Sequence, residues 1–382
     1  MKPIRALLLT AIVAACSQDS DPSRQFPLSP SPSFDRANNT VGQVYTMNNS
    51  PAGNAILAFD RAADGSLVAA GSYPTGGTGT GGGLGNQGGV VLNNAGNLLA
   101  VVNAGSNDVS LFVVNGDGTL QLTDRVSSGG TTPIGVTFHH DLLYVVNAGG
   151  SGNIAGFSIS PQGDLTSIAG SAQPLSTGAS GPAQISFAPG GNWLVVTEKA
   201  TNVISTYAVD HNGVASGPTT TTSSGATPFG FGFDQQGTLI VSEAFGGAAN
   251  ASAVSSYDAE GDGTWEAISP SVLTTETAAC WIVVTNSGRF AYTTNAGSGT
   301  ISGYAVQQGG LTLLDANGVT GNIGAGTGPS DMAVSRDSRF LYARAGGVNQ
   351  IAIFGINADG SLANLGGWIT GLPAGWNGLA AR

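Results

Sequence analysis

The sequence predicts an all-β fold, a seven-bladed β-propeller, and three observations support this. A degenerate repeat of roughly 50 residues runs along the chain. The 382 residues include 60 Gly, and 41% are hydrophobic while only 9% are charged. That balance is typical of short buried strands joined by many tight turns. Glycine-bearing turn sequences, the third observation, recur with the same period.

The repeat is clearest in three segments that end in Asn-Ala-Gly: Leu98-Leu99-Ala100-Val101-Val102-Asn103-Ala104-Gly105, Leu142-Leu143-Tyr144-Val145-Val146-Asn147-Ala148-Gly149 and Phe290-Ala291-Tyr292-Thr293-Thr294-Asn295-Ala296-Gly297. We place the same landmark in every copy, at Asn48, Asn103, Asn147, Thr197, Ser242, Asn295 and Arg344. Seven landmarks predict seven blades, each with four short strands.

The turns and the two ends of the repeat region complete this picture. Asn115-Gly116-Asp117-Gly118 and Ala358-Asp359-Gly360 supply the positive φ angles that tight hairpins need. Residues 41–47 have the pattern of a second strand, and residues 375–381 that of a first strand. The C-terminal strand should therefore complete the first blade and close the ring, which removes exposed sheet edges. Residues 41–382 form one predicted propeller domain.

The N-terminal segment has the pattern of a bacterial export signal. Lys2 and Arg5 precede an apolar run at residues 6–15 that is too short to span a bilayer. Val13-Ala14-Ala15-Cys16 resembles a lipobox, so we predict a signal peptide at residues 1–15 and lipidation of Cys16. Residues 16–40 then form the lipidated N-terminus and a Pro-rich tether. The alternative is an ordinary secretory signal with a chance Cys.

These features predict an exported lipoprotein on the periplasmic or cell-surface side of the bacterial envelope, attached to the membrane only through its lipid. The formal net charge of -11 argues against nucleic acid as a partner, because phosphate binding needs clustered Lys and Arg. We expect a monomer. The three histidines, His139, His140 and His211, fall in turns on the far face, so Ser-His-Asp chemistry is not expected at the site described next.

In such blades one face collects the connections between second and third strands and those between successive blades, and binding residues gather there. The candidate catalytic residues on this predicted rim are Glu198, Glu243, Lys199 and Arg344. The candidate substrate-binding residues are Asn103, Asn147, Gln184, Trp281, Asn295, Asp331 and Asn377. The alternative interpretation is that the Asn residues satisfy backbone groups at strand ends and that the charges are solvated or paired.

Two further features of the sequence bear on ligand binding. Residues 75–89 are rich in Gly and join the first blade to the second; no helix follows to build an anion site, so a flexible loop is expected. Glu198, Glu243, Asp331 and Asn147 are ligand types that calcium accepts. No cofactor is expected, with a divalent cation such as calcium as the alternative.

Residues 41–382 resemble the propeller-type lactonase family, which includes 6-phosphogluconolactonases and carboxymuconate-lactonizing enzymes. The resemblance rests on the YVTN-like repeats above, on Val195-Val196-Thr197-Glu198-Lys199-Ala200-Thr201-Asn202, and on Gly181-Pro182-Ala183-Gln184. The family carries an Arg-His pair after Gly-Pro, where this chain has Ala183-Gln184. The resemblance therefore implies the fold more strongly than the activity.

Two hypotheses follow for function. In the first, the chain is a lactonase-like hydrolase of a small lactone or sugar-like ligand, in which Glu198 or Glu243 activates water and Lys199 or Arg344 stabilises the oxyanion. In the second, it is a non-catalytic envelope propeller that binds a glycan, a peptide or an envelope protein on the same face.

Overall fold

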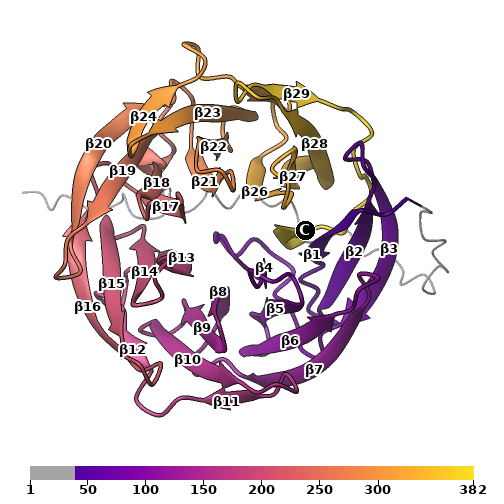
Figure 1. The fold of residues 1–382 in the computed structure, drawn as a ribbon, viewed down its shortest axis with the longest axis vertical. Coiled ribbons are helices and arrows are strands. Elements are labelled where there is room, and N and C mark those ends of the chain that lie inside the picture. Colours follow the sequence, from indigo (N-terminus) through magenta and orange to yellow (C-terminus); the bar gives the residue numbers. More distant parts are fainter. Residues whose placement is uncertain (1–38) are drawn as a thin grey trace, which may run out of the picture.

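The computed structural model describes residues 39–382, which form seven antiparallel sheets around a central axis (Figure 1). The described residues contain no α-helix, only the 3₁₀ turns η1 (Phe245–Gly247) and η2 (Gly346–Val348). None of their helices is long and apolar enough to span a bilayer. The predicted fold class is confirmed. The predicted signal peptide, the lipidation of Cys16 and nearly all of the tether lie outside the described residues.

Each blade has four main strands, ordered from the channel outward. The inner strands, from the first blade to the seventh, are β30 (Asn377–Ala381), β4 (Val90–Leu92), β8 (Pro133–His139), β13 (Pro182–Phe187), β17 (Pro228–Phe233), β21 (Ala279–Val284) and β26 (Pro329–Val334). The second strands are β1 (Gly42–Met47), β5 (Leu98–Asn103), β9 (Leu142–Asn147), β14 (Trp193–Glu198), β18 (Leu239–Glu243), β22 (Phe290–Asn295) and β27 (Phe340–Ala345).

The outer half of each blade follows in the same order. The third strands are β2 (Ala55–Arg61), β6 (Asp108–Val114), β10 (Asn153–Ile159), β15 (Val203–Val209), β19 (Ala253–Ala259), β23 (Thr300–Gln307) and β28 (Gln350–Ile356). The fourth strands are β3 (Leu67–Pro74), β7 (Leu120–Ser127), β11 (Leu165–Ser167), β16 (Ala215–Thr222), β20 (Trp265–Leu273), β24 (Gly310–Leu313) and β29 (Leu362–Asn364). Short strands β12 (Gln173–Pro174) and β25 (Gly321–Asn322) add to the third strands of blades three and six.

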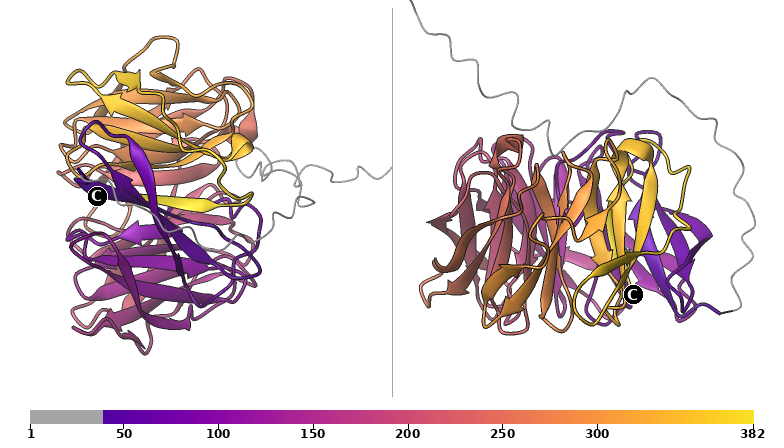
Figure 2. Two further views of the ribbon diagram at one scale, coloured as in Figure 1. Left: turned by 90° about the vertical axis from the view of Figure 1, so that its right-hand side faces the viewer. Right: turned by 90° about the horizontal axis from the view of Figure 1, so that it is seen from above.

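The ring has two faces, which Figure 2 shows from the side. We call the connection face the one that carries the links between second and third strands and between successive blades. The turn face carries the turns between first and second strands and between third and fourth strands. The end of β30, at Arg382, lies on the turn face, toward the viewer in Figure 1.

The ring closes as the sequence predicts, because β30 from the C-terminus pairs with β1 from the N-terminal part of the chain. Thr46 Oγ1 donates to the carbonyl of Gly378 at 2.6 Å, and the Leu379 N–H donates to Asp331 Oδ2 at 3.3 Å. β30 thus pairs with the second strand of the first blade and also hydrogen-bonds to the seventh blade.

Neighbouring blades are also joined by a recurring tyrosine on the second strand. Four buried tyrosines donate their hydroxyls to the glycine carbonyl of a neighbouring blade's hairpin turn. The pairs are Tyr45–Gly118 (3.0 Å), Tyr144–Gly213 (2.6 Å), Tyr292–Gly360 (2.8 Å) and Tyr342–Gly65 (2.9 Å). All four glycines have φ between 77° and 88°, a region that only glycine adopts at little cost. The glycine turns expected from the sequence therefore also dock one blade against the next.

Candidate functional site

The polar residues that end the second strands point to the third strand of their own blade or to the link from the preceding blade, and not into the channel. Asn103 Nδ2 donates to Asp108 Oδ1 at 2.6 Å and to Ser110 Oγ at 2.8 Å, both on the third strand β6. Asn295 Nδ2 likewise donates to Thr300 and Ser302 of β23 at 3.0 and 2.9 Å. Asn147 Nδ2 donates to the carbonyl of Ser128 at 3.1 Å.

The two candidate catalytic glutamates occupy the same position. Pro182 pairs with Glu198 and Pro228 with Glu243, just as Pro133 pairs with Asn147. Both glutamates are fully buried. Glu198 accepts hydrogen bonds from Ser205 Oγ at 2.6 Å and from the N–H of Ser176 at 3.0 Å. The structure therefore places these glutamates away from the rim that the sequence suggests.

A one-residue difference in register explains this outcome. The sequence places the landmark at Thr197 and Ser242, but the strand pairing aligns Glu198, Glu243 and Ala345 with the asparagines. Because side chains alternate along a strand, a shift of one residue moves a side chain to the opposite side. The residue one position earlier on each of these second strands points the other way. Its side chain donates to a backbone carbonyl at the start of the next blade's inner strand, as seen for Thr197, Ser242, Thr294 and Arg344.

The channel mouth on the connection face is filled by part of the Gly-rich connection, residues 84–89, which we call the plug. This segment reaches from the start of β4 toward the middle of the ring (Figure 1). The Gln87 side-chain amide forms two hydrogen bonds with Ile282 of the sixth blade, donating to its carbonyl at 2.6 Å and accepting from its N–H at 3.0 Å. The Gln87 N–H donates to Ala183 of the fourth blade at 3.0 Å. The predicted flexible loop is thus an ordered closure of one mouth.

Three predicted site residues hold this plug. Lys199 Nζ donates to the carbonyl of Gly85 and lies 4.6 Å from the centre of the Phe229 ring. Burial of the ammonium lowers the pKa of Lys199 to about 7. Trp281 Nε1 donates to the carbonyl of Asn86, and Asn377 Nδ2 donates to Asn86 Oδ1 at 3.1 Å. The structure brings Lys199, Trp281 and Asn377 together as partners of the plug.

Arg344 lies at the junction between the seventh blade and the closing strand. Its Nε donates to the carbonyl of Trp376 at 2.7 Å, and Nη1 donates to Ser330 Oγ at 2.8 Å. The guanidinium carbon is 5.0 Å from the Trp376 ring centre, and the residue is 5% exposed. These contacts give Arg344 a part in ring closure.

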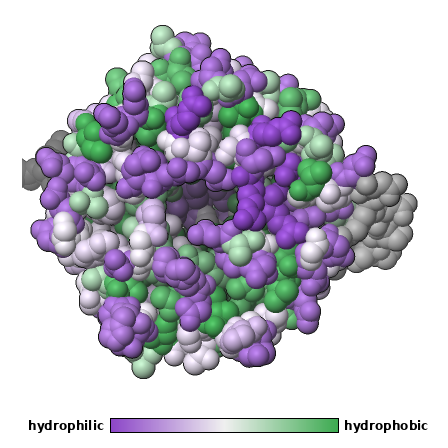
Figure 3. Space-filling view, in the orientation of Figure 1, coloured by the Kyte–Doolittle hydropathy of each residue, from purple (hydrophilic) through white to green (hydrophobic). Residues whose placement is uncertain are grey.

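Below the plug, a cavity of about 270 Å³ occupies the channel. Gln87 and Gly88 bound it on the plug side, and Leu92, Thr137, Ser186 and Ala381 lie toward the other end of the inner strands. Figure 3, which looks onto the turn face, shows a hollow at the centre of the ring. The channel is therefore reached from the turn face, opposite to the face chosen from the sequence.

Asp331 is the acidic residue on the wall of this cavity. Its carboxylate accepts hydrogen bonds from the N–H groups of Met332 at 2.9 Å and Leu379 at 3.3 Å, and only 3% of the residue is exposed. Burial raises the pKa of Asp331 to about 7, although these N–H groups, that of Gly88 and the charge of Arg344 act in the opposite direction. A carboxyl with this pKa exchanges protons near neutral pH.

Two further polar side chains line the cavity. The Gln184 side-chain amide donates to the carbonyl of Phe231 at 2.9 Å and accepts from its N–H at 2.7 Å. Like Gln87, it satisfies the channel-facing backbone groups of an innermost strand, which has no neighbouring strand on that side. Thr137 Oγ1 accepts from the Phe187 N–H at 3.2 Å and donates to no group among residues 39–382. Its proton is therefore available to a ligand.

The ligand types considered for calcium are not gathered at one point. Glu198, Glu243 and Asp331 belong to the fourth, fifth and seventh blades, and each carboxylate accepts hydrogen bonds from its own surroundings. Within residues 39–382, no group of three or more His, Cys, Asp or Glu is arranged to hold a metal ion.

Sequence reasoning did not single out Thr137, or the arginines of the turn face that are described below. Thr137 carries no local signal, because an alternating strand holds many threonines. The arginines carry a local signal, because basic residues are scarce, Arg61 ends β2, and Arg382 directly follows β30 on the same face.

The plug gives a direct prediction. Gln87→Ala leaves the N–H and carbonyl of Ile282 without protein partners, so we expect a stability loss of about 1–2 kcal/mol, limited because water from the channel can reach them. We expect faster amide hydrogen exchange in residues 84–89, measured by mass spectrometry. The control Gln121→Ala changes an exposed residue of β7. Unchanged exchange in the plug would contradict the assigned role of Gln87.

The fold and the channel define the class of protein: a seven-bladed propeller with a polar-walled cavity on its axis. The family model described as lactonase, 7-bladed beta-propeller matches residues 53–174, 169–257 and 253–371. The chain belongs to this family. No curated protein matches the sequence.

Solved structures agree on the fold. The periplasmic gluconolactonase of Pseudomonas aeruginosa is 18% identical, with a TM-score of 0.67 over 88% of this chain and 98% of its own. A Lactobacillus plantarum protein is 18% identical, with a TM-score of 0.70 over 89% and 99%. A Bacteroides fragilis protein with a provisional assignment as a 6-phosphogluconolactonase is 18% identical, with a TM-score of 0.66 over 91% and 100%. At this identity the likeness shows the fold alone.

Proposed function

We propose that this chain is a lactonase-like hydrolase that opens a small lactone in the channel cavity, with Asp331 as the base that activates water. The observation that carries the proposal is a buried carboxyl on the wall of a cavity of about 270 Å³, where burial raises the pKa of Asp331 to about 7. A general base works best when its pKa lies near the working pH. Membership of the lactonase family supports the reaction class.

The chemistry needs three steps in this cavity. The Asp331 carboxylate takes a proton from water as the water oxygen attacks the lactone carbonyl. The Thr137 hydroxyl, on β8 across the channel from β26 (Figure 1), donates a hydrogen bond to the developing oxyanion. The ring C–O bond then breaks, and Asp331 returns the proton to the leaving alkoxide, so the product is a hydroxy acid.

The test is turnover on a panel of five- and six-membered sugar lactones. We expect Asp331→Asn to lower kcat/KM by roughly a hundredfold or more, because general base catalysis is lost. Wild-type kcat/KM should rise with pH through about 7, where Asp331 loses its proton. Asp141→Asn, an exposed acid on the turn face, is the matched control. Equal rates for Asp331→Asn and the wild type would overturn the assignment.

A stability measurement separates catalysis from damage to the fold. The folded-state pKa of Asp331 lies above the ordinary value of 3.8, so its contribution to stability is present below pH 4 and is lost as the pH rises through about 7. In Asp331→Asn this part of the pH dependence should disappear, which denaturant unfolding between pH 4 and 8 will show. A folded, inactive variant with that flatter profile supports the proposal.

The second candidate function is a non-catalytic propeller that binds a glycan, a peptide or a protein. It is supported by the plug, which fills the connection-face mouth, and by the enclosure of Glu198 and Glu243 within their blades. A wild-type protein that opens no lactone on the panel, yet binds an oligosaccharide or peptide saturably, would favour this function over hydrolysis.

A further inference from the structure

The wall of the channel cavity is mainly aliphatic. Nine of its fifteen lining residues are Ala, Val, Leu, Ile or Met. Val91 and Leu92 of β4 and Ala381 of β30 line the cavity and are only half-buried by the rest of the protein. A ligand that covers these side chains gains from the apolar surface that it removes from water. The wall therefore favours a ligand whose body is mainly hydrocarbon.

No cationic side chain lines this cavity among residues 39–382, and Asp331 is the one ionisable residue in its lining. Arg344 acts on Asp331 through its charge but lies outside the lining, where it donates to the carbonyl of Trp376 and to Ser330 Oγ. A phosphate or carboxylate that entered the cavity would leave water for a wall without a positive partner. Once Asp331 is ionised, it would also repel that anion.

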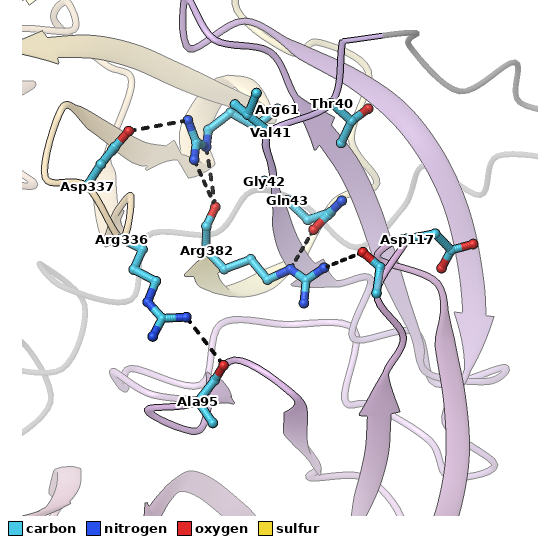
Figure 4. Close-up of a pocket in the computed structure, with 11 residues that line it drawn as sticks. Thr40, Val41, Gly42, Gln43, Arg61, Ala95, Asp117, Arg336, Asp337 and Arg382 are labelled. Carbon is cyan, nitrogen blue, oxygen red and sulfur yellow. Dashed lines mark hydrogen bonds and ion pairs between the residues drawn. The ribbon is translucent and has the colours of Figure 1, made fainter.

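The arginines of the turn face do not supply the missing charge. Arg61, Arg336 and Arg382 line a separate hollow of about 740 Å³ between the first, second and seventh blades (Figure 4). Arg61 donates to the carbonyl of Arg382 at 3.3 and 3.2 Å, and its Nη1 lies 3.9 Å from Asp337 Oδ2. Arg382 Nε donates to Gln43 Oε1 at 2.5 Å, and Arg336 donates to a backbone carbonyl of the second blade at 3.4 Å. These partners hold the three guanidinium groups outside the channel cavity.

The polar side chains of the cavity wall are largely occupied by the protein itself. The amides of Gln87 and Gln184 each donate to and accept from the backbone of an inner strand. Ser186 Oγ donates to the carbonyl of Phe187 at 3.1 Å. The Thr137 hydroxyl proton suits one carbonyl oxygen, as a simple lactone offers. A sugar lactone would bury several hydroxyls with few partners, which is costly.

We propose that the channel cavity accepts uncharged lactones with a mainly aliphatic body and discriminates against phosphorylated, carboxylated and polyhydroxylated ones. The volume of about 270 Å³ equals that of roughly nine water molecules at about 30 Å³ each, which suits a small ring with a short alkyl chain. This preference rests on the hydrolysis proposed above, so the experiments below separate the two.

The first test compares three six-membered lactones near pH 7: δ-hexanolactone, D-glucono-δ-lactone and the 6-phosphate of the latter. The measurement is kcat/KM of the full chain, with the uncatalysed rate subtracted. We expect δ-hexanolactone to exceed D-glucono-δ-lactone by about tenfold or more, and the phosphate to be the poorest substrate. If either sugar lactone is opened as fast as δ-hexanolactone and this depends on Asp331, hydrolysis stands and the proposed preference is overturned.

The second test adds a cation to the wall. Ser186→Lys places an ammonium in the cavity, so the ratio of kcat/KM for the phosphate to that for δ-hexanolactone should rise roughly tenfold. Leu92→Lys makes the same change on the wall of another blade. Ser216→Lys, at an exposed serine on β16 of the same blade as Ser186, is the matched control and should keep the wild-type ratio. An unchanged ratio in both cavity variants would show that charge in the cavity does not set the preference.

A binding measurement distinguishes failure of the preference from failure of hydrolysis. Saturation-transfer NMR on Asp331→Asn should give signals from δ-hexanolactone and much weaker ones from D-glucono-δ-lactone. This result would support the preference even if the wild type opened no lactone, in which case the hydrolase proposal alone would fall. Absence of binding by δ-hexanolactone, or equal signals from both lactones, overturns the proposal.

Discussion

Deleting residues 376–382 will leave a chain that does not fold cooperatively. The deletion removes β30, so β1 becomes an open edge and the seventh blade loses its neighbour. Trp376, which is fully buried beside Tyr342 and Ile351, is also lost. Removing a buried Trp side chain alone costs about 3–5 kcal/mol, a large share of the roughly 5–15 kcal/mol that holds a typical protein folded.

The measurement is thermal and urea unfolding followed by circular dichroism. We expect no cooperative transition for the truncated chain, which will aggregate through its exposed strand edge. A synthetic peptide of residues 370–382 should restore a transition, and a scrambled peptide of the same composition should not. A truncated chain with wild-type stability would show that ring closure depends on other contacts.

The second large effect is expected at Glu243. Its carboxylate accepts hydrogen bonds from the N–H of Gly225 at 2.7 Å, from Ser255 Oγ at 2.6 Å and from Ser271 Oγ at 2.7 Å. No cation pairs with it among residues 39–382. Glu243→Ala leaves these donors unpaired around a new cavity, so we expect a loss of about 3 kcal/mol or more in unfolding free energy.

Two further substitutions, one conservative and one on the surface, serve as comparisons for Glu243→Ala. Glu243→Gln keeps one acceptor oxygen but brings an NH₂ group against the donors, so a loss of about 1–2 kcal/mol is expected. Glu266→Ala changes an exposed residue of the same blade and should stay within about 0.5 kcal/mol of the wild type. If Glu243→Gln retained full stability but lost all lactone turnover, Glu243 would be catalytic, as the sequence first suggested.

The fold could be predicted from the sequence because its determinants are local. Each blade has its own strand pattern and its own glycine turn, so seven degenerate copies reinforce one another. The closing strand was also predictable, since residues 375–381 have a first-strand pattern with no partner nearby in the sequence. The direction in which each polar side chain points was harder to predict from the sequence. Thr197 and Glu198 are both polar, and nothing local decides which one faces inward.

The site depends on contacts that no local pattern contains. Gln87 hydrogen-bonds to Ile282, 195 residues away, so a Gly-rich stretch that reads as a flexible loop is ordered by distant backbone groups. The raised pKa of Asp331 likewise arises from burial among strands of the first, second and seventh blades. A hollow of about 740 Å³ on the turn face likewise combines residues from the first, second and seventh blades.

The plug also bears on how the molecule unfolds. In a repeat protein each unit touches only its neighbours, so units can be lost one at a time from an end. Here the link between the first and second blades reaches the third blade through Asn86 and the sixth through Gln87. These cross-ring contacts act as an axial pin, because opening any one of the joined blades releases contacts to the others. Ring closure and pin together make the propeller a single cooperative unit, unlike an open array of repeats.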